Sequence, residues 1–151
     1  MNLESPIRFL FPGLLGAIGV ALFLAGQLHV PGLSRSGGGD TAAITSTVER
    51  YYKGFADADT AAVCGSTSTN SMAQWTRGTA GCEAVVQSQI MPSIPQATRA
   101  SFASVKVHEV IVEDRLAQAE ISFDGGQHGP VYLERVSERW MMRSLHPLRA
   151  P

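Results

Sequence analysis

The feature that most constrains the fold of this chain is an uncharged apolar run near its N-terminus. From Phe9 to Gly26 the sequence reads FLFPGLLGAIGVALFLAG, eighteen residues without a charged or amide side chain. That length is near the lower limit for a helix that crosses a hydrocarbon core of about 30 Å. Pro12 and the glycines would weaken a helix in water but are tolerated in a membrane helix. The run therefore predicts a transmembrane segment within residues 1–30 and a separate folded remainder.

Two interpretations of this segment stay open, a retained signal-anchor and a cleaved signal peptide. A signal peptide usually has an apolar run of about 7–15 residues followed by a small-x-small cleavage site. This run is longer, and its small-x-small options, such as residues 32–34, lie beyond its end. These features favour the anchor over cleavage. Arg8 favours a cytoplasmic N-terminus, so we expect the C-terminal domain outside the cytoplasm, either at the cell membrane or secreted.

Residues 31–40, PGLSRSGGGD, are rich in Gly, Ser and Pro, which predicts a flexible linker. The chain has twelve Lys/Arg and thirteen Asp/Glu, and Arg8, Arg35 and Glu4 precede the domain. The domain therefore keeps ten basic and twelve acidic residues, a net charge of −2. That charge gives no reason to expect a nucleic-acid partner, and no polybasic segment is present to bind anionic lipid.

The first half of the domain has helical periodicity. An apolar stripe predicts a helix over residues 41–57, with Asp40 as its N-cap and Gly54 allowing close packing. The stripe consists of Ile44, Val48, Tyr51 or Tyr52, and Phe55. Further helices are expected over residues 60–64, 71–76 and 81–91. Asp59 is the expected cap of the first of these, and Pro92 and Pro95 are expected to end the last.

The second half changes to the alternating period of β-strands. Strands are expected over residues 102–112, 117–123, 131–136 and 139–145, with a glycine-rich loop at 124–130. The alternation slips at His108-Glu109, which predicts a bulge or strong twist. Helices followed by an antiparallel meander predict an α+β domain, with helices covering one face of a curved sheet of about four strands.

The ordered residues from about 41 to 146 resemble small secreted or membrane-anchored actinobacterial proteins of the nuclear transport factor 2-like (SnoaL-like) superfamily. The matching residues are Tyr52, Ala56, Asp59, Cys64, Cys82, Arg115, Ala117, Arg139 and Trp140. Ala58 departs from the pattern, because glycine is common there. The resemblance implies a cone-shaped domain over residues 41–146 with a pocket between helices and bent sheet, and possible homodimers. Residues 147–151 are expected to form a short tail after the domain. It implies no particular activity, because the superfamily contains both enzymes and binding domains.

The only two cysteines, Cys64 and Cys82, bracket the stretch CGSTSTNSMAQWTRGTAGC. In an oxidising compartment such a pair favours a disulfide, here one that closes a loop of about nineteen residues. Two unpaired buried thiols are the alternative. A zinc site or a redox pair is disfavoured because the chain has neither CxxC spacing nor a close Cys/His pair.

Tyr52, His108 and Trp140 are the candidate pocket residues, although burial in the core explains Trp140 more simply. No set of nucleophile, base and orienting residue can be assembled, and no catalytic residue, metal ligand or cofactor is assigned. The sequence therefore favours a non-catalytic extracytoplasmic module that binds a partner protein, an envelope component or a small apolar ligand. A small-residue stripe in the apolar run also permits a partner within a membrane complex.

An acid–base enzyme of the isomerase or dehydratase kind is the alternative to a binding module. It requires a group such as His108, Asp124 or Tyr52 to point into an apolar pocket, where burial or a neighbouring charge can shift a pKa.

Overall fold

The domain is α+β, with helices first and a four-stranded antiparallel sheet last, as the sequence predicts. The computed structural model describes residues 38–77 and 80–148. The predicted transmembrane segment and the linker up to residue 37 lie outside the described residues. Within the described ranges, no helix combines the length and apolar character that crossing a membrane requires.

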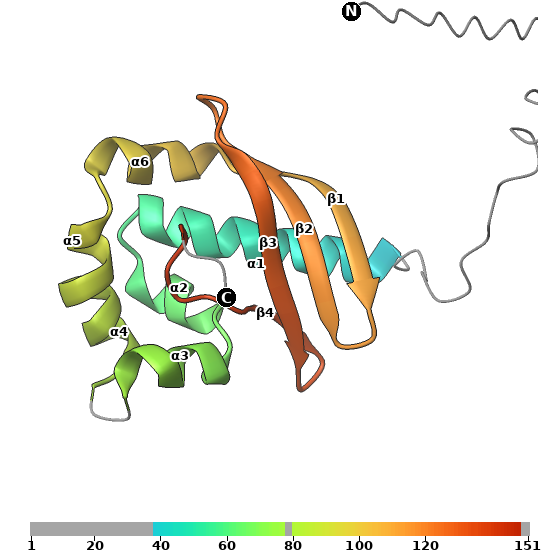
Figure 1. Ribbon diagram of the computed structural model, residues 1–151, viewed down its shortest axis with the longest axis horizontal. Helices are drawn as coiled ribbons and strands as arrows, with labels where there is room; N and C mark the ends of the chain where they lie inside the picture. The colour runs from blue at the N-terminus through green and yellow to red at the C-terminus, as the bar shows by residue number, and fades with distance from the viewer. Residues whose placement is uncertain (1–37, 78–79, 149–151) are drawn as a thin grey trace, which may run out of the picture. The chain divides into compact units, whose positions relative to one another are not determined.

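Short helices surround one long one, and the strands follow in a meander (Figure 1). The helical elements are α1 (Gly38–Ala56), α2 (Thr60–Gly65), α3 (Thr69–Thr76), α4 (Cys82–Val85), the π-helical turn η1 (Val86–Ile90), α5 (Met91–Ser93), α6 (Gln96–Ser101) and the 3₁₀ turn η2 (Phe102–Ser104). The strands are β1 (Lys106–Glu113), β2 (Leu116–Ser122), β3 (His128–Val136) and β4 (Arg139–Met142), hydrogen-bonded in that order.

Helix α1 runs across one face of the sheet, and the shorter helices lie to one side of the sheet (Figure 1). The strands turn small and apolar side chains toward this covered face. Ala117, Ala119 and Ile121 alternate along β2 and are buried, and Leu133 of β3 is buried opposite Ala117. The small alanine side chains leave room for the large apolar residues of α1, so the core lies between this helix and the sheet.

The predicted stripe of α1 is confirmed, and all its members are buried. The helix begins at Gly38, inside the predicted linker, so Asp40 lies in the first turn and is not the N-cap. Its carboxylate instead accepts a hydrogen bond from the indole N–H of Trp140 at 3.0 Å. Trp140 is only 4% exposed, and a buried indole N–H needs an acceptor, which explains why the acid is drawn to this position.

The junction between α1 and α2 follows from three neighbouring residues. Ala58 has φ +56°, and the next N–H, of Asp59, bonds back to the carbonyl of Gly54 at 2.8 Å, which closes the end of α1. The Asp59 side chain then accepts from the N–H of Ala62 at 2.9 Å, so its predicted role as cap of α2 is confirmed. A Cβ on Gly54 would lie 2.9 Å from a Val63 methyl, so the glycine permits close packing of the two helices.

Gly54→Ala is expected to destabilise the domain by about 1–3 kcal/mol, the usual effect of overpacking a tight contact. Although alanine favours helices, its methyl would also lie 3.1 Å from the backbone nitrogen of Val63, which cannot move as a side chain can. Urea unfolding followed by tryptophan fluorescence measures the change in free energy of unfolding.

The matched control is Ala58→Gly, at the same helix end, which places glycine where φ is positive. It is expected to stabilise the domain by about 1 kcal/mol, because a left-handed conformation strains an L-residue but not glycine. A stable Gly54→Ala variant would contradict the close packing of α1 and α2, and an unstable Ala58→Gly variant would contradict the assigned helix end.

Cys64 and Cys82 form a disulfide, with their Cα atoms 6.0 Å apart, which confirms the predicted pair. The bond joins the end of α2 to the start of α4. Near it, the hydroxyl of Thr60 donates to a Glu83 carboxylate oxygen at 3.3 Å. The disulfide therefore fixes two helices that share few other polar contacts among the described residues.

Removing the disulfide with Cys64→Ser and Cys82→Ser together is expected to lower the free energy of unfolding by about 3 kcal/mol, the loop-closure value for a loop of this size. Thermal unfolding of the oxidised wild type, the reduced wild type and the double variant measures the effect. Equal stability of the oxidised and reduced wild type would show that the bond adds nothing to the fold.

Two expectations about the middle of the chain are wrong. Pro92 does not end the fourth predicted helix, which passes through η1 and continues to Ser93. Pro92 instead stands in the first turn of α5, where a missing N–H is tolerated. Residues 96–104 are helical, so the first strand starts at Lys106 and not at residue 102. Phe102, fully buried among other aromatic rings, contributes to the core from a helical turn.

The sheet confirms the predicted bulge and corrects two strand ends. The register of β1 and β2 shifts between Val107 and Val110, at the predicted position. Strand β3 begins at His128 and not at residue 131, with Pro130 paired to Glu120 of β2. Strand β4 stops at Met142, so it pairs with β3 only as far as Leu133. Pro130 thus lies where β3 has a partner on one side only, a position that tolerates a missing donor.

Candidate functional site

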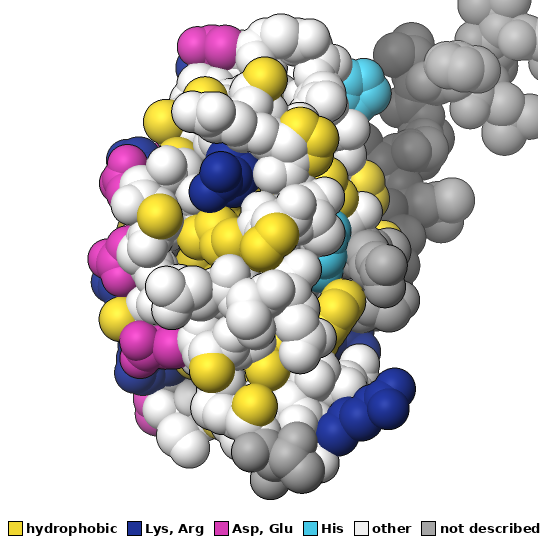
Figure 2. Space-filling view, turned by 90° about the vertical axis from the view of Figure 1, so that its left-hand side faces the viewer, with side chains coloured by type: hydrophobic (Ala, Val, Ile, Leu, Met, Phe, Trp, Pro, Cys, Tyr) yellow, Lys and Arg dark blue, Asp and Glu magenta, His cyan; other side chains and the backbone are white. Residues whose placement is uncertain are grey.

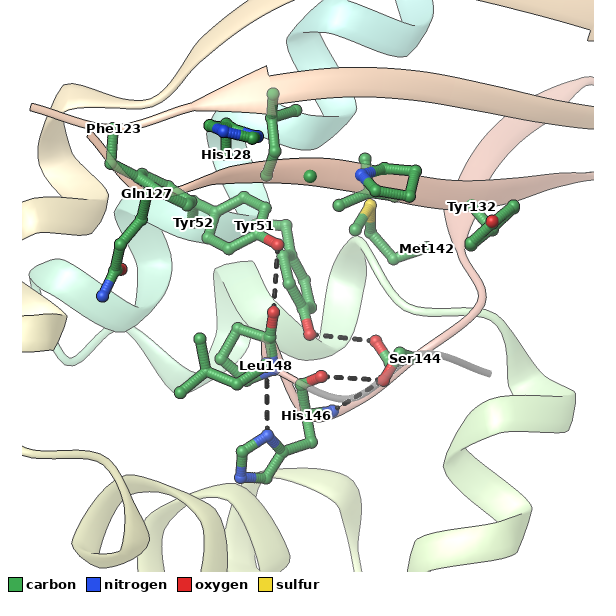
Figure 3. Close-up of a pocket in the computed structure, with 15 residues that line it drawn as sticks. Tyr51, Tyr52, Phe123, Gln127, His128, Tyr132, Met142, Ser144, His146 and Leu148 are labelled. Atoms are coloured by element: carbon green, nitrogen blue, oxygen red, sulfur yellow. Dashed lines mark hydrogen bonds between the residues drawn. The ribbon is translucent and has the colours of Figure 1, made fainter.

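A cleft of about 400 Å³ opens beside the first half of β3, residues 128–132, which has no partner in β4. Its walls come from α1, from the facing ends of β2 and β3 with the loop between them, and from the C-terminal segment Ser144–Leu148 (Figure 3). The lining residues are Tyr51, Tyr52, Ile121, Phe123, Gln127, His128, Gly129, Pro130, Val131, Tyr132, Met142, Ser144, His146, Pro147 and Leu148. Most of them are apolar or aromatic, as in small-molecule sites.

Two consecutive tyrosines of α1 hold the C-terminal segment in place. The hydroxyl of Tyr51 donates to the carbonyl of Ser144 at 2.9 Å, and that of Tyr52 donates to the carbonyl of Pro147 at 3.1 Å (Figure 3). Their rings meet edge to face with centroids 5.1 Å apart. Burial raises the pKa of both phenols above the ordinary value, and the Tyr51 pKa is raised further by its Tyr52 neighbour. Both groups therefore remain protonated donors at neutral pH.

The C-terminal segment is also fixed from its far side by His146. Its Nδ1 accepts the N–H of Leu148 at 3.2 Å, which places the ring hydrogen on Nε2. Nε2 lies 3.3 Å from the hydroxyl of Ser93, which donates to the carbonyl of Ile90 at 2.7 Å. The ring stacks on Trp75, with centroids 5.9 Å apart. In Figure 3 the imidazole extends away from the two tyrosines, so it supports the segment from behind the cleft.

Pro147 and Leu148, at the start of the predicted tail, are therefore part of the cleft wall. Pro147 accepts the Tyr52 hydroxyl, and Leu148 lines the cleft although its side chain is 52% exposed. The physical reason is that a buried phenol needs an acceptor. Among the described residues, the backbone carbonyls of this segment supply one for each tyrosine.

Of the three predicted pocket residues, only Tyr52 lines the cleft. His108 lies on the exposed bulge of β1, where its Nε2 is 2.6 Å from the Ser122 hydroxyl. Trp140 is buried between Asp40 and the Arg135 guanidinium, which lies 5.9 Å from the indole ring centroid. It joins the start of α1 to the end of the sheet, so its role is structural.

Sequence reasoning missed the residues that the C-terminal segment and the β2–β3 loop contribute. The sequence predicts Gln127 and Gly129 in the loop at residues 124–130, and Ser144 in the last strand. The available signal was the adjacent tyrosine pair, because two phenols on a buried helix face require partners from elsewhere in the chain. Nothing in the spacing of residues 144–148 identifies them as those partners.

The chemistry of the cleft is that of an apolar site with a few neutral polar groups. Across the described residues, no Asp, Glu, Lys or Arg lines it, and no group of three or more possible ligands is placed to hold a metal ion. The deep hydroxyls already donate to backbone carbonyls. This arrangement suits an apolar guest better than a charged one.

No family model, curated protein or solved structure matches this chain.

The raised pKa values of the tyrosines predict a loss of stability in alkali. In the unfolded chain these phenols ionise near pH 10, whereas in the folded domain they keep their protons. The folded state then binds more protons, so stability falls as pH rises above about 10, by up to about 1.4 kcal/mol per pH unit for each tyrosine. Urea unfolding between pH 8 and pH 11 measures the slope.

The control for this prediction is the double variant Tyr51→Phe, Tyr52→Phe. It is expected to lose about 1 kcal/mol per hydrogen bond at neutral pH and to show a shallower fall above pH 10. If wild type and variant have the same slope, the two phenols do not account for the alkaline loss.

Proposed function

We propose that this chain is an extracytoplasmic binding domain, tied to the membrane by its N-terminal apolar run, whose cleft takes a small apolar ligand. The observation that carries the proposal is the cleft between Tyr51, Tyr52 and the uncovered part of β3. Its volume of about 400 Å³ falls in the range of small-molecule sites, about 300–1,000 Å³. Hydrogen bonds from Tyr51 and Tyr52 hold the C-terminal segment in place, and the β2–β3 ladder holds the opposite wall. The cleft is therefore formed without a ligand.

The disulfide supports the proposed location. Such bonds persist in oxidising compartments and are rare in the cytosol of most organisms. The Cys64–Cys82 bond fits a domain on the outer side of a membrane, which is where the apolar run at Phe9–Gly26 would leave it.

Membership of the nuclear transport factor 2-like superfamily is part of the proposal. The order of helices before an antiparallel sheet and a cleft between α1 and the sheet are in keeping with it. That superfamily supports many functions, so the cleft and not the fold supports a binding role.

The surroundings of the three candidate acid–base residues favour binding over catalysis. The hydroxyl of Tyr52 donates to a carbonyl and its pKa is raised, so it is a poor base at neutral pH. His108 lies outside the cleft, on the β1 bulge. Asp124 forms an exposed ion pair with Lys106 at 3.2 Å.

A photoreactive alkane tests the proposal on the full chain in lipid nanodiscs. A medium-chain alkyl diazirine is irradiated with the protein, and the labelled peptides are mapped by mass spectrometry. We expect labels on the peptides that carry Tyr51, Phe123 and Met142, which all line the cleft. Gly129→Phe is expected to abolish them, because a Cβ at this inward-facing strand position meets nothing within 4 Å and the ring would fill the cleft.

The matched control is Gly81→Phe, which adds the same side chain at another glycine with open space around it, outside the cleft. The probe partitions into lipid equally in the two samples, so a difference in labelling of the cleft peptides reports binding in the cleft alone. Equal labelling of the cleft peptides in the two variants would refute the proposed function.

A further inference from the structure

The cleft lining includes both almost fully buried residues and exposed polar ones. Deep in it, Tyr51 and Tyr52 are almost fully buried, at 0% and 2% exposure. At the other extreme, Gln127 and His128 are exposed while still lining it. In Figure 3 these two side chains lie with Phe123 at one end of the lining set, away from Tyr132 and Ser144. A ligand in the cleft therefore has one end among rings and one end at a polar mouth.

The hydroxyls of the two α1 tyrosines are already used, and the polar side chains of Gln127 and His128 are not. Both tyrosine hydroxyls donate to carbonyls of the C-terminal segment. By contrast, among the described residues the side chains of Gln127 and His128 form no hydrogen bond or ion pair. The mouth thus offers an amide and an imidazole to a guest, whereas Tyr51 and Tyr52 offer it no free hydroxyl.

The loop that presents these two residues is itself held in shape. The N–H of Phe123 donates to the carbonyl of Gln127 at 2.9 Å, and the N–H of Asp124 donates to the Ser104 hydroxyl at 2.8 Å. The Phe123 ring packs against the rings of Tyr52 and Phe102, with centroids 5.1 and 5.3 Å away. The mouth is therefore anchored to the aromatic core next to the tyrosine pair.

The groups at the mouth can donate hydrogen bonds to an acceptor. No Asp, Glu, Lys or Arg lines the cleft in the described part of the chain, so the head group meets hydrogen-bonding groups and no counter-ion of either sign. The nearest acid in the sequence, Asp124, is paired with Lys106. Acidic side chains lie along one edge of the face in Figure 2 with Lys and Arg side chains among them, and the histidines in view lie toward the opposite edge. An amide N–H and an imidazole N–H both donate to a carboxylate.

We propose that the ligand is a medium-chain amphiphile with a carboxylate head, its tail lying against Phe123, Pro130 and Leu148 and its head bound by Gln127 and His128 at the mouth. This proposal rests on the proposed function and adds the ligand class and the residues that select it. Burial of the tail supplies most of the affinity, and the hydrogen bonds to the head group determine the selectivity among acid, alcohol and amine.

Competition against the neutral alkyl diazirine tests the head group, again with the full chain in nanodiscs of uncharged lipid. Decanoate, decanol and decylamine have equal tails and differ in the head. We expect decanoate to displace the probe from the cleft peptides at about ten-fold lower concentration than decylamine, with decanol between them, because charge-assisted hydrogen bonds are the stronger ones. Equal potency of decanoate and decylamine would overturn the proposal.

Two variants test which residues bind the carboxylate head. Gln127→Ala and His128→Ala are each expected to weaken decanoate by about five- to ten-fold. His108→Ala is the matched control, because this exposed histidine lies on β1 outside the cleft. It is expected to leave both the potency of decanoate and the direct labelling by the neutral probe unchanged. Unchanged decanoate potency in both mouth variants would refute the assigned residues.

The outcomes separate the two proposals. Labelling that Gly129→Phe abolishes but that shows no preference among the three heads would leave the apolar cleft standing and reject carboxylate selection. Labelling that Gly129→Phe does not affect would reject both.

Discussion

The hydrogen bonds from two consecutive tyrosines to the C-terminal segment are the contacts on which the cleft depends. Tyr51 and Tyr52 are both buried, so each hydroxyl needs an acceptor, and Ser144 and Pro147 supply the carbonyls. The same contacts remove the deep polar groups from reach of a guest. One pair of side chains therefore completes the core, forms a wall and sets the apolar character of the interior.

The elements that the sequence predicts well are those fixed by local chemistry. Asp59 caps α2 because its side chain reaches an N–H three residues on, and Gly54 marks a close helix contact that any Cβ would fill. The alternating Ala117, Ala119 and Ile121 identify the covered face of β2. The cysteine pair follows from the compartment that the apolar run implies.

The elements that the sequence does not predict depend on contacts between distant residues. The alternation after residue 101 is too short to separate a strand from a helical turn, and the buried Phe102 ring fits both. The role of Pro147 depends on a tyrosine 95 positions away. His108 was a candidate by residue type alone, and the β1 bulge places it outside the cleft. Site residues supplied by chain ends and hairpins leave no periodic signal.

Methionine methyl NMR is the most direct measurement of the central claim, that a ligand occupies this cleft. Met142 lines the cleft and is 2% exposed, whereas Met91 is 7% exposed and lies outside it. With the full chain in nanodiscs, titration with decanoate is predicted to shift the Met142 methyl resonance to saturation and leave that of Met91 in place. A Met142 resonance that does not move, or equal shifts at both methionines, would contradict the account.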